Sequence, residues 1–291
     1  MNINTFEQLN EICISQNKKI YEVAQENMAK DADITIDEVR AFTNRSLFAM
    51  KEAIQTGLAS KELSLSGMCG QDCDRVQKRF RQTPAIFGKT FEKIITYALA
   101  TSEENIRMGK IVDCPTAGSC GILPSTLVAI SEDFDYSERI QIDALITAGE
   151  IGRIVSNKVA LAGAVAGCQA ECGTAAAMSA AAICQMRGGS VSQILNAAAL
   201  TLKNILGLTC DPVAGLVEVP CVKRNPIMAV LSITAVELAL SGVESKIPID
   251  EIIDAMEQTG ALMSPTLKES SQAGLATTKT GLEVQKRVFG R

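Results

Sequence analysis

The sequence predicts an all-α protein, a compact multi-helix domain whose loops rich in glycine and cysteine gather at one site. Hydrophobic residues make up 47% of the 291 residues, yet aromatic residues make up only 4% and tryptophan is absent. Such a core suits closely packed helices better than strands rich in aromatic residues. Apolar residues recur at helical spacing, and Gly, Ser and Pro separate the periodic segments without any strand-rich stretch.

The charge and the cysteine content restrict the function. A net charge of -5 argues against nucleic acid or an anionic membrane as the main partner. With no basic run, leader or lipidation motif in view, we expect a cytoplasmic protein. Ten cysteines in such a chain are free, metal-bound or catalytic. Because histidine is absent, the chain cannot form a Ser-His or Cys-His dyad, and a general base must be another side chain or come from another chain.

Residues 1–58 are expected to form two amphipathic helices that pack on a catalytic domain of residues 59–291, with Gly57 ending the first unit. We expect the two parts to make one structural unit. A capping-box pattern marks the start of each helix: Thr5 with Gln8, and Thr35 with Glu38.

Small residues between positions 64 and 73 predict a tight loop before a helix. Cys69 and Cys73 lie four apart and would share a face if both were helical. Two structural thiols are the preferred interpretation, and a metal pair is the alternative. The basic residues between 75 and 81 are interpreted as a solvated helix face.

The segment from Asp113 to Pro124 is a second dense loop of small residues, and it also precedes an apolar helical pattern. Consecutive small residues at a helix start expose backbone N–H groups, which suit a carboxylate or a phosphate. No Gly-Lys-Ser/Thr follows, so the segment is not a P-loop. An ordinary tight turn and an anion cradle both remain open.

The run from Val159 to Arg187 is dominated by alanine and glycine. Because Gln169 and Glu171 lie within it, we interpret the run as a buried helix pair and not as a membrane span. The segment 167–173 interrupts the run with polar groups, which need a partner or a function in an apolar setting.

The segment 207–225 is interpreted as a fixed loop between two rigid helices. Ser190 with Gln193 predicts a capping box at the start of the first helix, which Gly207 should end. Asn225 as N-cap and Pro226 at the first position should begin the second. A further helix should follow Pro248 and end at Gly260, ahead of a small, polar tail.

Three segments carry cysteines that could bind a metal: residues 114–120, 168–172 and 210–221. No Cys-x-x-Cys pair exists, which disfavours a zinc ribbon or a ferredoxin-type motif. Thiolates that converge from separate loops suit an iron–sulfur cluster, and three ligands would leave one iron open as a Lewis acid. The alternative is that small buried cysteines pack with alanine and glycine.

Four segments of the sequence resemble the motifs of bacterial iron–sulfur-dependent L-serine dehydratases, in the order of the alpha chain of the two-subunit type. They are PTAGSCG (115–121), GCQAECG (167–173), GLTCDPVAGLVEVPCVKRN (207–225) and LKESSQAGLA (267–276). The resemblance implies an all-helical catalytic domain with a [4Fe–4S] cluster held by Cys168, Cys210 and Cys221.

The resemblance also implies the reaction, which removes water from L-serine and yields pyruvate and ammonia. The substrate carboxylate would lie in a cradle formed by Thr116, Ala117, Gly118 and Ser119. Lys268 and the loop 67–72 match segments that border the pocket. A proton-transferring histidine belongs to the beta chain or beta domain of this family, so a chain without histidine is expected to need that partner.

Four other functions stay open at this point. A related L-cysteine desulfidase would use the same cluster. A non-catalytic iron–sulfur electron-transfer or sensor protein would leave the cradle without a purpose, and a structural helical subunit would hold no iron. A pyridoxal-phosphate dehydratase lacks a lysine in a convincing phosphate-binding context.

Overall fold

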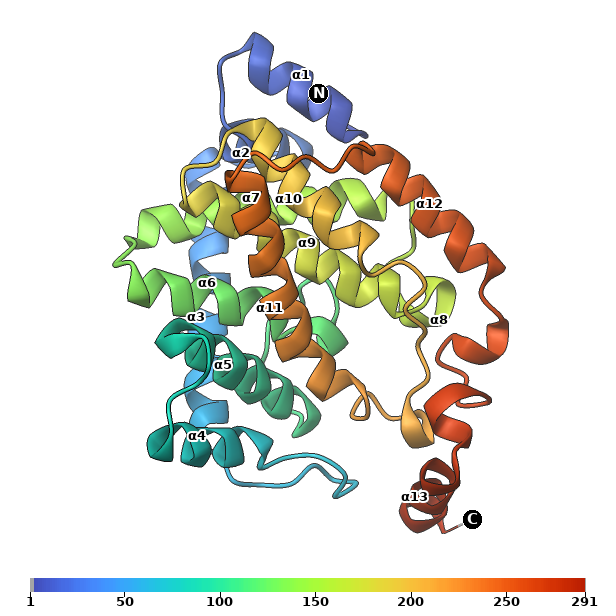
Figure 1. Ribbon diagram of the computed structural model, residues 1–291. Coiled ribbons are helices and arrows are strands. Elements are labelled where there is room, and N and C mark those ends of the chain that lie inside the picture. The colour runs from blue at the N-terminus through green and yellow to red at the C-terminus, as the bar shows by residue number, and fades with distance from the viewer. Residues whose placement is uncertain (1–2, 291) are drawn as a thin grey trace.

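The computed structural model describes residues 3–290 as an assembly of helices (Figure 1). In this part of the chain no β-strand forms, and the only β-type pairs are two isolated bridges, Leu63 with Gly70 and Cys210 with Lys268. The all-α prediction is therefore confirmed. No helix in residues 3–290 is both long and apolar enough to cross a membrane.

The α-helices are α1 (Phe6–Ser15), α2 (Ile20–Ala32), α3 (Ile36–Ala59), α4 (Asp72–Gln82), α5 (Gly88–Ile106), α6 (Ile122–Asp133), α7 (Glu138–Ser156), α8 (Gly163–Ala166), α9 (Cys168–Met186), α10 (Val191–Lys203), α11 (Cys221–Leu240), α12 (Ile249–Leu262) and α13 (Lys279–Phe289). Four short 3-10 turns connect them: η1 (Ala117–Ser119), η2 (Val213–Gly215), η3 (Pro265–Leu267) and η4 (Gly274–Thr277).

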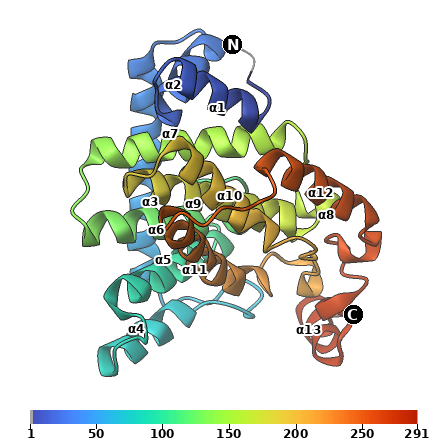
Figure 2. The ribbon, with the colours of Figure 1, turned by 45° about the horizontal axis from the view of Figure 1, so that its top comes forward.

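Helix α9 lies at the centre, and α6, α7, α10 and α11 pack around it (Figures 1 and 2). Its middle carries two alanine triplets, 175–177 and 180–182, whose side chains are all fully buried. Such small side chains let neighbouring backbones approach closely. The run from Val159 to Arg187 thus contains the long buried helix α9, as predicted, but α8 is a single turn in which Ala164 and Val165 are exposed, so the predicted buried pair is one buried helix.

The N-terminal segment contains three helices, so the expectation of two was wrong. Helix α2 was missed because Lys19 is not a preferred N-cap residue and its helix is polar apart from a narrow apolar stripe. At the start of α2, the backbone N–H of Lys19 donates to the side-chain carboxylate of Glu22 at 2.8 Å. Helix α2 buries Ile20 and Val23 and packs on α3 and α7. The division at residue 58 stays a prediction.

Capping patterns located some helix starts correctly. The capping boxes at Thr35 and at Ser190 are both present. The Thr5 hydroxyl caps the N–H of Gln8 at 3.2 Å, but the Gln8 side chain accepts from Asn4 and not from Thr5. At these three helices, the short capping pattern therefore predicted the N-cap residue correctly.

Three helix ends differ from prediction because tertiary contacts override the local pattern. Gly57 lies inside α3 and packs against the backbone of Ala100. Helix α10 ends at Lys203, ahead of Gly207 with its φ of +85°. Gly260 lies inside α12, where its lack of a side chain lets Ala166 approach.

Asn225 does not begin α11, which already starts at Cys221 and contains Pro226 in its first turns. Its side chain, fully buried, instead donates to the Gly118 carbonyl at 2.8 Å and accepts from the Gly121 N–H at 2.9 Å. Pro226 lies one turn inside α11, so the helix lacks the hydrogen bond that an N–H at this position would donate to the Val222 carbonyl. Asn225 is free to tie α11 to the loop before α6.

The first cysteine-bearing loop precedes α4 as predicted, but Cys69 lies outside that helix and shares no helical face with Cys73. Both thiols are buried. The basic residues of α4 form exposed ion pairs with their own helix: Arg75 with Asp72, and Lys78 with Asp74. This arrangement matches the expected solvated face.

Candidate functional site

Three potential ligands meet where α9 begins. The sulfurs of Cys168 and Cys210 and a carboxylate oxygen of Glu171 all lie within 4.8 Å of one another. Cys168 is the first residue of α9 and Glu171 lies one turn later, so both point from one helix end. Cys210 comes from the connection between α10 and α11. We call these three residues the cysteine–glutamate group.

Glycine leaves the room that this group occupies. A Cβ atom at Gly163 would lie 2.8 Å from the Cys210 sulfur and 3.4 Å from a Glu171 oxygen. Gly167 has a φ of +78°, which other residues rarely adopt, and it turns the chain from α8 into α9. The small residues of this segment therefore give the sulfur and carboxylate atoms their common space.

Hydrogen bonds to the C-terminal part of the chain hold the backbone of Cys210 in place. Its N–H donates to the Leu267 carbonyl at 2.9 Å, and its carbonyl accepts from the Glu269 N–H at 2.6 Å. Asp211 accepts the Leu275 N–H at 2.7 Å. The tail motif 267–276 thus lies against the Cys210 loop.

The electrostatics of the group favour one thiolate. Hydrogen bonds from the thiols of Cys172 and Cys210 lower the pKa of Cys168 to about 3, and the nearby Arg224 guanidinium acts in the same direction. Burial, and then the Cys168 thiolate, raise the pKa of Glu171 to about 7. Soft thiolate donors of this kind bind iron or other soft metals and release protons on doing so.

Cys221 is buried at the first position of α11, and its sulfur is not among the atoms within 4.8 Å. Burial raises the pKa of the Cys221 thiol, and the nearby thiolate of Cys168 raises it further. The structure therefore brings Cys168 and Cys210 into one group and leaves Cys221 beside it.

The predicted cradle lies next to the cysteine–glutamate group. The Thr116 hydroxyl donates to Glu171 and lies 3.1 Å from the buried Ser119 hydroxyl. A Cβ atom at Gly118 would lie 2.5 Å from a Glu171 oxygen. Because Asn225 holds the Gly118 carbonyl, α11 fixes the loop in this position.

A cavity of about 660 Å³ opens on these residues, and Thr116, Ala117, Gly118 and Glu171 line it. Ser119 lies beneath it. Lys268 is not among the lining residues; it pairs with Cys210 through the isolated bridge, and its neighbour Glu269 faces the cavity. The loop 64–66 reaches the cavity through Leu65 and Ser66.

Sequence reasoning assigned no site role to three polar residues: Glu218, which lines the cavity, Arg224, which lies near Cys168, and Asn225. Glu171 carried a usable signal, because a carboxylate in an apolar, alanine-rich run needs a partner. Gln169, which gave the same signal, has a structural role; it accepts from the Gly207 N–H at 2.8 Å and donates to the Met256 carbonyl at 2.9 Å.

Comparisons with known proteins identify the family of the chain. The family described as serine dehydratase alpha chain matches residues 15–276. A probable L-serine dehydratase alpha chain of Bacillus subtilis is 42% identical over 284 residues, covering 94% of each chain. The L-serine dehydratase alpha chain of Peptoniphilus asaccharolyticus is 37% identical and covers 98% of this chain and 97% of its own. An L-serine dehydratase of Streptomyces coelicolor is 41% identical over 191 residues, which are 41% of that longer protein.

Proposed function

The chain belongs to the serine dehydratase alpha-chain family, and from this membership we propose that it is the alpha chain of an L-serine dehydratase. The reaction eliminates water from L-serine, and the aminoacrylate that forms hydrolyses to pyruvate and ammonia. The observation that carries the proposal is the cavity in which the Thr116–Gly118 loop meets Glu171, a member of the cysteine–glutamate group.

The donor set fits an iron–sulfur cluster. Cys168 and Cys210 offer two sulfurs at one point, the pKa of Cys168 favours thiolate, and Gly163 leaves the space that a side chain would fill. Cys168, Cys210 and Cys221 would hold a [4Fe–4S] cluster with one open iron. Such a cluster supplies a Lewis acid toward the substrate hydroxyl, the group that must leave.

The chain's own residues bind and orient the substrate. At the start of η1, the N–H groups of Ala117 and Gly118 make no backbone hydrogen bond within the described chain, and free amides of this kind suit the substrate carboxylate. Asn225 holds this turn at a fixed distance from α11, so the carboxylate would be presented in one orientation. Positioning of this kind lowers the barrier by removing rotational freedom before the reaction.

A partner chain completes the proposed site. Removal of the α-proton needs a base, and the chain has no histidine. The rim of the cavity carries Leu65 and Met108, which are 94% and 83% exposed. The exposed Phe289 lines the same cavity, and a contiguous apolar patch of this kind marks a protein contact surface, so we place the beta chain over this rim.

The test is iron and acid-labile sulfide per chain after anaerobic reconstitution, followed by an L-serine deamination assay with and without the beta chain. The wild type should bind about four irons. Cys168→Ser, Cys210→Ser and Cys221→Ser should each lose or degrade the cluster. Cys184→Ser is the matched control, since Cys184 is equally buried near the far end of α9. No iron in the wild type would refute the proposed mechanism.

A further inference from the structure

The charged residues of the cavity lining are all acidic. Three carboxylates face it, those of Glu171, Glu218 and Glu269, and no lysine or arginine is among its lining residues in the described chain. An arrangement of this kind attracts a cationic group and disfavours a ligand that carries only negative charge. The lining therefore favours a ligand that carries a positively charged group.

Of the three carboxylates, Glu218 is the one that burial and hydrogen bonds hold most firmly in one orientation. It is only 7% exposed, and both the Ser64 and the Ser66 hydroxyls donate to its Oε2 atom, at 2.6 and 2.8 Å. Its Oε1 atom receives no hydrogen bond from the residues 3–290. None of the ion pairs in this part of the chain includes Glu218. Because a buried carboxylate without a cation is costly, a cationic ligand would satisfy it.

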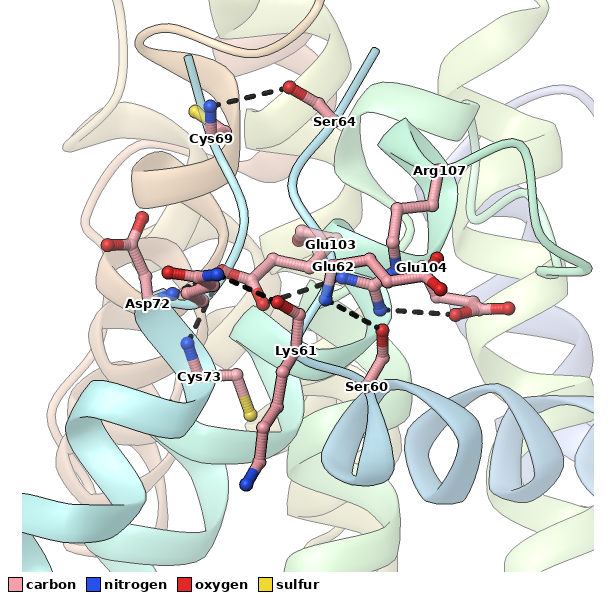
Figure 3. Close-up of polar contacts among 12 residues, drawn as sticks. Ser60, Lys61, Glu62, Ser64, Cys69, Asp72, Cys73, Glu103, Glu104 and Arg107 are labelled. Carbon is pink, nitrogen blue, oxygen red and sulfur yellow. Dashed lines mark hydrogen bonds and ion pairs between the residues drawn. The ribbon is translucent and has the colours of Figure 1, made fainter. Parts of the chain in front are cut away.

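Both serines belong to the loop between α3 and α4, and Figure 3 shows the two sides of this loop with Ser64 and Cys69 facing each other. The Ser64 N–H donates to the Cys69 carbonyl at 2.9 Å, and the Cys69 N–H faces the Ser64 hydroxyl at 3.4 Å. At the end of the loop, the N–H groups of Asp72 and Cys73 donate to Glu103, at 2.7 and 3.3 Å. Glu218 is thus oriented by hydroxyls on an anchored backbone, as a binding residue requires.

We propose that Glu218, held by Ser64 and Ser66, binds the α-ammonium group of the amino-acid substrate. This inference rests on the proposed function and names the group that recognises one part of its substrate. The carboxylate of an amino acid would contact the Thr116–Gly118 loop in the same cavity, and its ammonium group would contact Oε1 of Glu218.

The other two carboxylates are less suited to this role. Glu171 accepts the Thr116 hydroxyl with one oxygen, and its other oxygen lies 3.7 Å from the Cys168 sulfur. Glu269 is half-buried, and no hydrogen bond within the described chain orients its carboxylate. Glu218 alone combines burial, fixed orientation and a free oxygen.

The experiment compares two ligands that differ only in the ammonium group. L-glycerate carries a hydroxyl where L-serine carries the ammonium. For the reconstituted enzyme with its beta chain, we would measure the KM for L-serine and the inhibition constant of L-glycerate. Calorimetry would measure the Kd of both ligands independently of turnover. The variants are Glu218→Gln, Ser66→Ala, Glu269→Gln and, as the control, Glu62→Gln on the exposed part of the same loop.

Glu218→Gln should weaken L-serine binding about tenfold or more, the effect of losing a charged hydrogen bond, and leave L-glycerate binding unchanged or tighter. The quantity compared is the ratio of the Kd for L-serine to the Kd for L-glycerate. Ser66→Ala should raise this ratio as Glu218→Gln does, but by a smaller factor. Glu62→Gln should shift neither Kd. The ratio separates this role from a structural one, because a distorted pocket would weaken both ligands.

Two results would overturn the inference: a ratio in Glu218→Gln equal to that of Glu62→Gln, or a shift of the ratio in Glu269→Gln alone. If Glu218→Gln fails to fold, as judged by thermal unfolding, an unchanged ratio in Ser66→Ala overturns it equally. If the wild type binds L-serine in a manner that depends on Glu218 but does not deaminate it, the proposed function fails and the binding assignment stands.

Discussion

Replacing Gly57 by alanine should destabilise the protein, although the substitution favours a helix. Gly57 lies in the last turns of α3 and faces the backbone of α5. A Cβ atom at this position would lie 2.1 Å from the Ala100 carbonyl oxygen, 2.5 Å from its carbon and 2.9 Å from its Cα. All three are backbone atoms inside a helix, so no side chain can move aside.

The two opposing effects differ in size. Alanine in a helix interior stabilises by about 0.5–1 kcal/mol relative to glycine. Forcing an extra methyl group into a packed interface costs about 1–3 kcal/mol. Because the contact is with backbone, the cost should fall at the upper end, and the net loss should be about 2 kcal/mol. Because the unfolding entropy is about 2.1 cal/mol/K per residue, that loss lowers the melting temperature of a 291-residue chain by roughly 3 °C.

The matched control is Gly149→Ala in the interior of α7. There a Cβ atom would meet only the terminal methyl of Met28, at 3.4 Å. With no backbone in the way, helix propensity should dominate, and we expect about 0.5–1 kcal/mol of stabilisation. Thermal and urea unfolding of both variants measure the difference. Equal shifts, or a more stable Gly57→Ala, would refute the packing argument.

Three further predictions concern the site and a surface network. Gly163→Ala should weaken iron binding about 10–100-fold, because the new Cβ would lie 2.8 Å from the Cys210 sulfur; iron titration with unchanged affinity would contradict this. Asn225→Ala should destabilise by about 3 kcal/mol, since buried partners lose their hydrogen bonds; a loss under about 1 kcal/mol by urea unfolding would contradict it. Burial raises the pKa of Asp133, but hydrogen bonds, chiefly from Lys93, outweigh this and lower it. Asp133 therefore stabilises above its ordinary pKa and loses this effect as pH falls through the lower folded value. The difference in melting temperature between the wild type and Asp133→Asn should shrink between about pH 5 and pH 2, and a constant difference would contradict the assignment.

Much of the fold followed from local patterns. The alanine-rich run predicted the buried helix α9, and the capping boxes at Thr35 and Ser190 placed two helix starts correctly. These signals work because capping and periodicity depend on residues within one or two turns of each other. Where a helix lacks such signals, as at Lys19, the sequence predicted no start.

Parts of the candidate site were also predictable. The small residues at 116–118 indicated an exposed-amide loop that now lines a cavity, and two of the three proposed cysteine ligands lie together. The role of each in catalysis stays a prediction. Gly57 and Asn225 misled the local interpretation, because a glycine can serve close packing and an asparagine can serve a distant loop as readily as either can mark a helix boundary.

Only the tertiary structure placed Glu171 beside Thr116, and Ser64 beside Glu218, a pair separated by 154 positions in the sequence. By itself the sequence determined the all-α class, most of the helices, the thiol-bearing segments and the family they resemble, since these depend on neighbouring residues. Which carboxylates face the cavity depends on how those helices pack against one another. Packing brings together side chains whose separation in sequence does not predict their distance in space. For that reason, the contact of Glu218 with Ser64 could be identified only from the tertiary structure.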